Sequence, residues 1–348
     1  MTTAVERRAP PRLRGLADAV ATLYVAGLTL LMLASVVAPQ RAGPLALAQI
    51  FAPYLFLPVA GLALVAIWPG GRIARLAVAG GALLWALLFL PGLISVPTIP
   101  APDAQRITVA SWNTLQDNDD AEALRSTILD SGATVVAIQE LSPEQAELLA
   151  SDPAIGQRFR HRALYGRDRY LGIGILSAYP ILEEGTREFP PVVWARIDVR
   201  GRSVLVVNAH PLPGRIAWLH VGSQALPVGF NGVPRDDQIT TILAMLDALR
   251  KPGEPLLLVG DFNITEREPA YRELTAHLQD AKRAAGFGFQ NTWKSWFLLQ
   301  LPLAVLRIDY LFAGPGVDPV GFATDCRVAG SDHCLIRGQF EISPGAVP

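Results

Sequence analysis

The stretch Pro255-Leu-Leu-Leu-Val-Gly-Asp-Phe-Asn263 joins an apolar run to a carboxylate and an amide. A short apolar run of this kind is typical of a strand buried on both faces. Similar runs alternate with helical patterns between residues 106 and 342. Strands are expected at residues 106–112, 134–138, 172–176, 192–199, 203–208, 255–260, 308–313 and 334–342, with helices at 121–131, 143–150 and 236–249. This alternation predicts a layered α/β domain with buried sheets.

Polar side chains recur where these apolar runs stop. They are Asn113, Glu140, His210, Asp261, Asn263, Asp309, Asp332 and His333. Taken singly, each has an ordinary explanation, because Asn and Asp are common turn residues at strand ends. Taken together, the carboxylates and amides suit a hard cation such as Mg²⁺, and the histidines can bind phosphate oxygens or move protons near neutral pH. The set has no cysteine, which argues against zinc or iron–sulfur chemistry.

Six short motifs carry these residues, in the order Ala110-Ser-Trp-Asn113, Ala137-Ile-Gln-Glu140, Asn208-Ala-His210, Gly260-Asp-Phe-Asn263, Arg307-Ile-Asp-Tyr310 and Gly330-Ser-Asp-His333. The series resembles that of the endonuclease/exonuclease/phosphatase superfamily, which includes DNase I-like nucleases, sphingomyelinases and inositol-phosphate phosphatases. The resemblance runs from about residue 106 to residue 340. It implies a four-layer α/β sandwich, in which two packed β-sheets are flanked by helices and the motif residues meet at one edge of the sheets.

The resemblance also implies a metal site and a hydrolytic role for the carboxylates. Glu140 is expected to be the main ligand of Mg²⁺, or alternatively Mn²⁺, helped by Asn113 and Asp332. Asp261 would orient or deprotonate the attacking water, and Asn263 would hold a phosphoryl oxygen. Fixed positive charge and fixed donors of this kind stabilise the charge that concentrates during attack on phosphorus.

The two histidines are expected to act on the phosphate. His333, aligned by Asp309, would contact the scissile phosphate. His210 would contact the phosphate or protonate the leaving group. In the DNase I-like branch a glutamate on the preceding strand supports the equivalent of His210. Here that region reads Pro190-Pro-Val-Val-Trp194, and the nearest carboxylate belongs to Glu188.

The first third of the chain is apolar and almost uncharged. Between residues 15 and 102 the charged residues are Asp18, Arg41, Arg72 and Arg75. Residues 16–38, 45–68 and 73–96 form apolar stretches, each longer than the roughly 20 residues that a helix needs to cross a bilayer. A secretory signal peptide would explain only the first stretch, and buried soluble helices are rarely so long and uncharged. Three transmembrane helices are therefore expected, the second bent at Pro53 and Pro58.

The distribution of arginine predicts the orientation in the membrane. Six arginines lie before the first span or in the second loop, namely Arg7, Arg8, Arg12, Arg14, Arg72 and Arg75, against Arg41 and Arg106 on the opposite side. This bias predicts a cytoplasmic N-terminus. The expected organisation is a basic cytoplasmic segment at 1–15, a three-helix membrane anchor at 16–97, a linker at 98–105 and an extracytoplasmic catalytic domain at 106–343. The protein is thus expected in the cell membrane as a multi-pass protein.

Charge and apolar segments bear on the substrate. From residue 103 onward, 23 Lys and Arg residues stand against 29 Asp and Glu residues, a net charge of −6, whereas nucleases usually have a basic surface. Apolar segments at 211–234 and 295–306 contain Trp218 and Trp296, which suggest a lipid-facing rim, although the segments could pack on each other. Arg167, in a basic cluster, could meet a pyrophosphate or an anionic head group, or could belong to a solvated loop.

The expected function is hydrolysis of a phosphate ester or pyrophosphate on a membrane lipid, for example a polyprenyl pyrophosphate, outside the cytoplasm. The architecture is similar to membrane-anchored bacterial members of the superfamily that are associated with glycopeptide-antibiotic resistance. An extracytoplasmic nuclease and a non-enzymatic membrane receptor that retains the fold remain alternatives. The intact set of carboxylates and histidines argues against the receptor. Because of the net negative charge from residue 103 onward, nucleic acid is a less favoured substrate than a lipid. No protein partner is expected.

The two cysteines, Cys326 and Cys334, lie on either side of Ser331-Asp-His333. Two are too few for a disulfide-dense scaffold or a four-cysteine zinc site. A disulfide between them would hold the loop before the last strand, and the predicted topology would place it in an oxidising compartment. Two free, buried thiols are the alternative, because the sequence does not give their separation.

Overall fold

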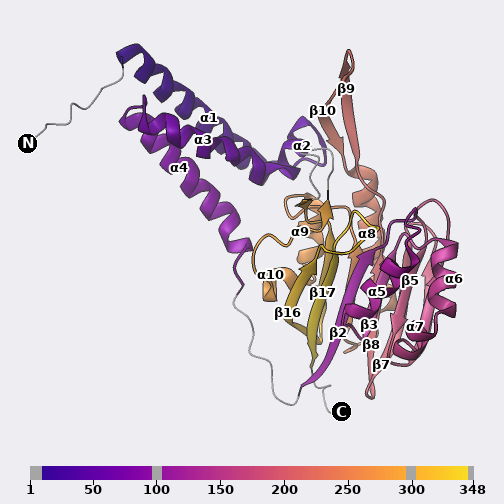
Figure 1. The fold of residues 1–348 in the computed structure, drawn as a ribbon. Helices are drawn as coiled ribbons and strands as arrows, with labels where there is room; N and C mark the ends of the chain where they lie inside the picture. The colour runs from indigo at the N-terminus through magenta and orange to yellow at the C-terminus, as the bar shows by residue number, and fades with distance from the viewer. Residues whose placement is uncertain (1–9, 96–103, 295–302, 344–348) are drawn as a thin grey trace, which may run out of the picture. The chain divides into compact units, whose positions relative to one another are not determined.

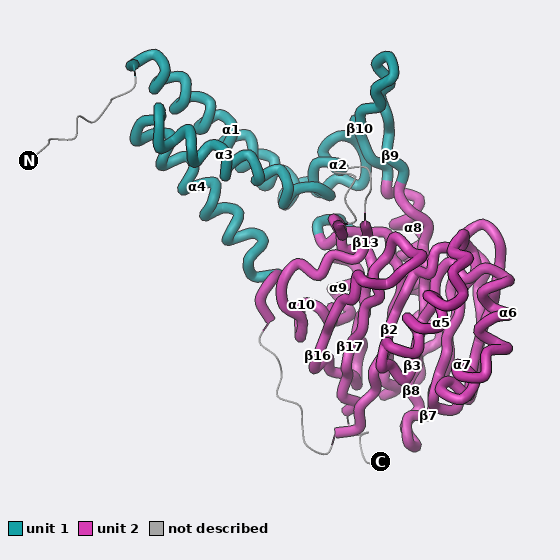
Figure 2. Tube along the Cα trace, in the orientation of Figure 1, with its two compact units in different colours: residues 1–92, 215–231, 267–269 teal, residues 93–214, 232–266, 270–348 magenta. Residues whose placement is uncertain are grey.

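The computed structural model describes residues 10–95, 104–294 and 303–343. The chain divides into two compact units, which Figure 2 shows in different colours. The first unit consists of residues 1–92, 215–231 and 267–269. The second consists of residues 93–214, 232–266 and 270–348.

Apolar helices make up most of the first unit. They are α1 (Pro11–Val37), α2 (Pro44–Ile50), α3 (Leu57–Ile67) and α4 (Arg72–Phe89), with 3₁₀ turns at Ala52–Phe56 and Leu90–Gly92. Two of them, Pro11–Val37 and Arg72–Gly92, are long and apolar enough to cross a membrane. The middle segment is bent by 82° between Pro44–Ile50 and Ala52–Ile67. The described residues therefore contain two helices of membrane length, or three if the bent pair is one span.

Proline explains the position of the bend. Pro53 lies in the 3₁₀ turn Ala52–Phe56, immediately after the break, and a proline has no backbone N–H to continue the helical hydrogen bonds. Asp18, the one acidic residue of α1, serves the neighbouring helix. Its Oδ1 atom accepts hydrogen bonds from the backbone nitrogens of Gly71, at 2.9 Å, and Ala74, at 2.8 Å. These bonds cap the amino end of α4, whose first N–H groups have no acceptor within the helix.

A small sheet completes the first unit. Its strands are β1 (Ala42–Gly43), β9 (Arg215–Val221) and β10 (Gln224–Asn231), in the order β1-β10-β9. β9 and β10 form an antiparallel hairpin within the apolar segment 211–234, and β10 also pairs with β1, the short strand between α1 and α2. The hairpin thus belongs to the same compact unit as the apolar helices (Figure 2).

Two six-stranded mixed sheets form the second unit (Figure 1). The first has the order β12 (Gln279–Asp280), β15 (Asp309–Ala313), β11 (Leu256–Asp261), β8 (Arg202–Ala209), β7 (Val192–Val199) and β6 (Ile181–Arg187). The second has the order β16 (Val317–Asp325), β17 (Leu335–Ile342), β2 (Gln105–Asn113), β3 (Val135–Gln139), β5 (Ile173–Ser177) and β4 (His161–Tyr165). A separate two-stranded sheet pairs β13 (Trp293–Lys294) with β14 (Ala304–Leu306).

The apolar runs of the central strands are buried on both faces. In β8, Val204 and Val206 belong to the core shared by the two sheets, whereas Leu205 and Val207 belong to a core formed with helices. Those helices are α8 (Val233–Leu249) and α9 (Pro269–Thr275). A third core packs α5 (Ala121–Asp130), α6 (Pro143–Ser151) and α7 (Pro153–Arg158) on the second sheet, and α10 (Ala281–Ala285) follows β12. A strand with helices on one face and a second sheet on the other reads as a continuous apolar run.

The strands and helices expected between residues 106 and 342 all form, with ends that differ by up to three residues. The sequence did not predict the edge strands β4, β6 and β16. β6 reads Ile-Leu-Glu-Glu-Gly-Thr-Arg, and β16 contains Pro319 and Gly321. Charges, proline and glycine are common on edge strands, where they discourage further pairing, so they hide the strand pattern.

Candidate active site

The carboxyl ends of parallel strands bring two predicted residues together in the first sheet. β8 and β11 are parallel, with Ala209 opposite Gly260. His210 directly follows Ala209, and Asp261 directly follows Gly260, so the two residues lie at the same edge of the sheet. β15 runs antiparallel to β11 and begins at Asp309, which is paired directly with Asp261.

The second sheet contributes residues in the same way. β2 and β3 are parallel, with Asn113 opposite Gln139, so Glu140 follows immediately after the paired ends. The loop before β17 is joined to β2 by the Oγ atom of Ser331, which donates to the carbonyl oxygen of Asn113 at 2.7 Å. The same Oγ accepts from the backbone nitrogen of His333 at 3.0 Å. This bond fixes the backbone of the predicted histidine beside the end of β2.

Side chains from both sheets converge on Asp261. The Nδ2 atom of Asn113 donates to Oε1 of Glu140 at 2.9 Å and to Oδ2 of Asp261 at 3.0 Å. The Nε2 atom of His210 lies 3.6 Å from Oδ2 of Asp261 and 3.8 Å from Oε1 of Glu140. The Nε2 atom of His333 lies 3.7 Å from the same Oδ2 atom. We call Asn113, Glu140, His210, Asp261 and His333 the central cluster.

Unusual backbone conformations aim some of these side chains. Glu140 has φ 55° and Asn263 has φ 54°, in the left-handed region that side chains rarely adopt. Gly260 has φ 139°, and a Cβ atom there would lie 2.0 Å from the carbonyl oxygen of Ala209. Each left-handed residue costs roughly 1–3 kcal/mol, a strain that clusters at functional sites. The fold therefore accepts local strain where Glu140 and Asn263 leave their strands.

Burial and neighbouring charge perturb two groups of the site. Burial, followed by repulsion from Asp309, raises the pKa of Asp261 to about 6. Burial alone would lower the pKa of His333, but the carboxylates of Asp309 and Asp261 outweigh it and raise that pKa to about 10. The site thus pairs a carboxyl group that titrates near neutral pH with an imidazole that is protonated there, a combination typical of catalytic sites.

The site has oxygen donors suited to a divalent metal. Asp261, Asp309 and His333 each offer a ligand atom within 4.8 Å of the others, and all three are buried. The Nδ1 atom of His333 is already bonded to Asp309, which leaves the carboxylate oxygens as the freer donors. Among the residues that the structure describes, Oδ1 of Asp332 is buried without a hydrogen-bond partner. Closely spaced, incompletely paired carboxylates fit a hard cation.

The predicted metal ligands occupy different positions around this group. Asn113 and Glu140 are in the central cluster. Asp332 lies at its margin, where Oδ2 accepts from the indole nitrogen of Trp293 at 3.0 Å and Oδ1 is 4.0 Å from Nε2 of His333. The geometry brings all three predicted ligands to one edge of the fold without assigning the metal to one of them.

Asn263 and His210 are held by backbone groups. The Nδ2 atom of Asn263 donates to the carbonyl oxygen of Pro211 at 3.0 Å, and its backbone nitrogen donates to Oδ1 of Asp261 at 2.9 Å. The backbone nitrogen of His210 donates to Pro191 at 2.9 Å. Within the described part of the chain, Nδ1 of His210 has no hydrogen-bond partner. The supporting carboxylate missing from the sequence before His210 is therefore not replaced by another described side chain.

The structure describes two of the three predicted substrate-binding residues, Arg167 and Trp218. The backbone nitrogen of Arg167 donates to Leu141, next to Glu140, at 3.1 Å, and its Nη1 atom lies 3.1 Å from Glu188. Trp218 lies in β9, in the first compact unit. Trp296 lies outside the residues that the structure describes.

Asn208 begins the motif Asn208-Ala-His210, but no role was predicted for it from the sequence. Its Nδ2 atom donates to the carbonyl oxygens of Ile138 and Gly174, both at 2.9 Å, and its Oδ1 atom accepts from Nε2 of Gln139 at 2.6 Å. Asn208 belongs to the first sheet and its three partners belong to the second, so it joins the sheets directly beside the site. The sequence feature that could have indicated this role is a single amide side chain within the apolar run of β8.

A disulfide and a threonine support the histidine. Cys326 and Cys334 are joined, so the first of the two alternatives for these cysteines is correct. The backbone nitrogen of Cys334 donates to Thr292 at 2.7 Å. The Oγ1 atom of Thr292 in turn accepts from the backbone nitrogen of Asp309 at 3.2 Å. Cys334, the residue after His333, and Asp309, the partner of His333, are thus held by the same threonine.

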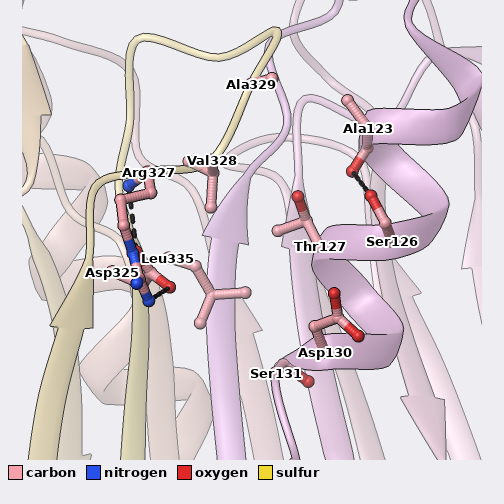
Figure 3. Close-up of a pocket in the computed structure, with 10 residues that line it drawn as sticks. All are labelled: Ala123, Ser126, Thr127, Asp130, Ser131, Asp325, Arg327, Val328, Ala329 and Leu335. Carbon is pink, nitrogen blue, oxygen red and sulfur yellow. Dashed lines mark hydrogen bonds and ion pairs between the residues drawn. The ribbon is translucent and has the colours of Figure 1, made fainter.

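A surface pocket of about 470 Å³ lies between α5 and the segment 325–329 (Figure 3). Its lining includes Ser126, Asp130 and the ion pair between Asp325 and Arg327, whose closest atoms are 2.8 Å apart. None of the predicted site residues lines it. The central cluster is therefore distinct from this pocket.

Comparisons with known proteins agree with this arrangement. A model described as "Endonuclease/Exonuclease/phosphatase family" matches residues 110–333, which span all six motifs. A comparison with curated protein sequences gave no match. Crystal structures match about two thirds of the chain, at identities that indicate a shared fold.

Three such structures are similar. An endonuclease/exonuclease/phosphatase from Bacteroides vulgatus is 20% identical, with a TM-score of 0.52 over 68% of this chain and 99% of that one. A humanized D. rerio TDP2 is 19% identical, with a TM-score of 0.51 over 68% of this chain and 100% of that one. A functionally unknown conserved protein from Enterococcus faecalis is 20% identical, with a TM-score of 0.51 over 68% of this chain and 100% of that one.

Proposed function

The chain belongs to the endonuclease/exonuclease/phosphatase family, and from this premise we propose that it is a membrane-anchored, Mg²⁺-dependent hydrolase of a lipid phosphate ester or pyrophosphate. One observation carries the proposal. The carboxylates of Glu140 and Asp261 are bridged by the amide of Asn113, and His210 and His333 both face Asp261 within 3.7 Å. An acid–base pair and metal-binding oxygens thus share one site.

Asp261 is suited to activate water. Its pKa of about 6 allows the ionised carboxylate to accept a proton from water near neutral pH. The hydrogen bonds from Asn113 and from the backbone nitrogen of Asn263 fix the orientation of that carboxylate. The water oxygen then bonds to phosphorus, and its proton passes to Asp261. A bound Mg²⁺ would neutralise phosphate charge and polarise the phosphoryl oxygens.

The imidazoles stabilise the phosphoryl group and the departing oxygen. His333 is protonated at neutral pH, and Asp309 holds its Nδ1 atom, so the Nε2–H group is available to a phosphoryl oxygen. When the bond from phosphorus to the leaving oxygen breaks, that oxygen takes a proton from His210 or from solvent. The missing carboxylate partner of His210 makes His333 the better defined of the two groups.

The apolar first unit supports a lipid as the substrate. Its two long helices and the bent pair supply two or three membrane-length segments. We take the bent pair as one span, which gives three crossings. The two ends of the anchor then lie on opposite sides of the membrane. An enzyme confined to a bilayer meets lipid phosphates at high local concentration. The net charge of −6 after residue 102 also disfavours a polyanion such as DNA.

Two observations favour an active site outside the cytoplasm. Arginines are concentrated before the first span and between the second and third, which favours a cytoplasmic N-terminus. The disulfide between Cys326 and Cys334 lies beside His333, and disulfides persist mainly in oxidising compartments. With three crossings, both observations lead to the same side.

The proposal is tested by the purified full-length protein in phospholipid vesicles with Mg²⁺. The substrates are a polyprenyl pyrophosphate, sphingomyelin, a phosphoinositide and plasmid DNA. We expect at least one of the three lipid substrates to be hydrolysed, with the polyprenyl pyrophosphate as the leading candidate. The activity should disappear when a chelator removes the metal. Equal or faster cleavage of DNA would overturn the lipid proposal in favour of a nuclease. No hydrolysis of any phosphate ester would favour a receptor that retains the fold.

A further inference from the structure

The β9–β10 hairpin is apolar on both of its faces. Residues 216–230 include no Asp, Glu, Lys or Arg. Leu219 is paired with Leu226 and Trp218 with Pro227, and neighbouring pairs point to opposite faces of a strand ladder. Leu219, Val221 and Leu226 are 50%, 58% and 49% exposed. A hairpin that packs one face on a protein core presents polar residues on the other face, whereas the polar side chains of residues 216–230 are limited to His220, Ser223 and Gln224 near the turn.

The hairpin is attached to the end of a membrane-length helix. In β10, Phe230 and Asn231 pair with Gly43 and Ala42 of β1. β1 begins five residues after α1 ends at Val37, and α2, on the other side of β1, packs against β10. Hairpin and helices belong to one compact unit (Figure 2). The base of the hairpin therefore lies where a membrane-spanning α1 leaves the hydrocarbon layer.

Backbone polarity limits how deep the hairpin can lie. Among the strands that the structure describes, β9 stands at the edge of the order β1-β10-β9. Such an edge is not stable within hydrocarbon, but head groups and water can bond to it at the interface. Trp218 and His220 on β9 have rings with an apolar body and a polar nitrogen, which suit the same layer.

We propose that the β9–β10 hairpin is a membrane-interface element, which rests among the lipid head groups with Leu219, Val221 and Leu226 against the acyl chains. The occupant of both apolar faces is thus the bilayer that holds α1. This binding requires the membrane anchor and does not require a lipid substrate. Only its effect on turnover rests on the proposed function.

The segments on either side of the hairpin in the sequence both contact Asn263. On the entering side, Pro211 accepts from the side chain of Asn263, and the backbone nitrogen of Leu212 donates to Gln238 at 3.0 Å. On the leaving side, Nη1 of Arg235 donates to the carbonyl oxygen of Asn263 at 2.7 Å. Both connections thus bear on Asn263. The segment that follows His210 therefore leads directly from these contacts into the hairpin.

Quenching by spin-labelled lipid tests the contact. The Leu219→Cys variant of the full-length protein carries a nitrobenzoxadiazole label, and vesicles contain phosphatidylcholine with a nitroxide on the acyl chain. The two native cysteines are bonded to each other and do not compete for the label. The matched control is the Glu147→Cys variant, labelled on the exposed face of α6. We expect strong quenching at residue 219 and little at residue 147.

Other occupants give different results. If β9 instead pairs with a second copy, labels at residue 219 transfer energy to each other as the protein-to-lipid ratio rises, and lipid nitroxides do not quench them. If the hairpin packs on its own chain, neither quenching nor energy transfer is seen. Either result overturns the proposal.

Kinetics separate this proposal from the proposed function. Introducing charge with Leu219→Asp and Leu226→Asp should raise the KM for a vesicle-borne lipid substrate by at least about fivefold, because burial of apolar side chains in the interface is lost. Leu182→Asp, at an exposed leucine of β6, is the matched control and should leave KM unchanged. An unchanged KM in the double variant overturns the effect on turnover. Quenching without lipid hydrolysis overturns the proposed function and retains the membrane contact.

Discussion

The Nδ1 atom of His333 lies 3.0 Å from Oδ2 and 3.2 Å from Oδ1 of Asp309, and both side chains are buried. Asp309 begins β15 of the first sheet, whereas His333 precedes β17 of the second. The pair therefore crosses from one sheet to the other. It orients the imidazole so that Nε2 faces Asp261, and it holds the proton on the ring.

Removing the charge of Asp309 should make His333 titrate at lower pH. In Asp309→Asn the carboxylate that chiefly opposes the effect of burial is lost, so the His333 pKa falls from about 10 toward or below 6.5. The decrease of kcat/KM on the alkaline side of the pH profile should therefore begin at a lower pH than in the wild type. A pH–rate profile at fixed Mg²⁺ measures the shift, and Asp247→Asn, on the exposed side of α8, is the control. An unmoved alkaline limb would show that Asp309 does not set the charge of His333.

Replacing Asp261 should separate activity from stability. Its raised pKa means that the folded protein binds this proton more tightly than the unfolded chain, so the resulting stability is lost as pH rises from 3.8 through about 6. Asp261→Asn resembles the protonated form at every pH. Above pH 7 in chelator, it should raise Tm by a few degrees while lowering kcat at least about 100-fold. Asp247→Asn should change neither, and a lower Tm for Asp261→Asn would contradict the argument.

Glu140 should govern metal affinity. Glu140→Gln keeps the size of the side chain and the acceptor for Asn113 but removes the charge. We expect binding of Mn²⁺, followed by calorimetry, to weaken at least about tenfold to 100-fold, with activity partly restored at high metal concentration. The control is Glu147→Gln on α6, which is exposed. Metal binding that is equal in both variants would exclude Glu140 as a ligand.

The disulfide should matter for both folding and turnover. Cys326 and Cys334 are eight residues apart in the sequence, and closing a loop of that length stabilises by about 2–3 kcal/mol. The double variant Cys326→Ser, Cys334→Ser should lose about that much on urea unfolding and should turn over more slowly, because Ser331 and His333 lie within the loop. Reductant should affect the wild type in the same way and leave the double variant unchanged. A wild type indifferent to reductant would rule this out.

Asn208 should stabilise the contact between the sheets. Asn208→Ala leaves the carbonyls of Ile138 and Gly174 and the amide of Gln139 without this partner. The free energy of unfolding should fall by roughly 2–4 kcal/mol, since buried groups lose their hydrogen bonds. Urea titration measures the change, and Gln157→Ala, exposed on α7, is the control. A loss no larger than that of the control would refute the role of Asn208.

The sequence predicted the parts of the fold in which apolar pattern and packing coincide. Strands such as β8 and β11 are buried on both faces and read as unbroken apolar runs, and the polar residues after them gather at one edge. Edge strands such as β6 and β16 were not predicted, because charged residues and proline are common at the exposed edge of a sheet and hide the strand pattern. The β9–β10 hairpin escaped because its apolar residues lack the polar alternation of a half-buried strand.

The side chains of the candidate site could be predicted from the sequence, whereas most of the residues that hold them in place could not. Asn113, Glu140, Asp261 and His333 stand out as polar residues that end apolar runs. The contacts of Asn208 and Thr292 depend on which strands become neighbours across the two sheets, and no local pattern carries that information. The bond from Asn263 to Pro211 likewise depends on tertiary placement.

Asp18 has a consequence for how the protein is made. The ribosome delivers Asp18 more than fifty residues before the amino end of α4, and Asp18 supplies the acceptor for Gly71 and Ala74. The late helix therefore finds its terminal amides satisfied by a helix already synthesised. A chain shortened at its N-terminus, so that it begins after Asp18, would have to insert α4 without that acceptor.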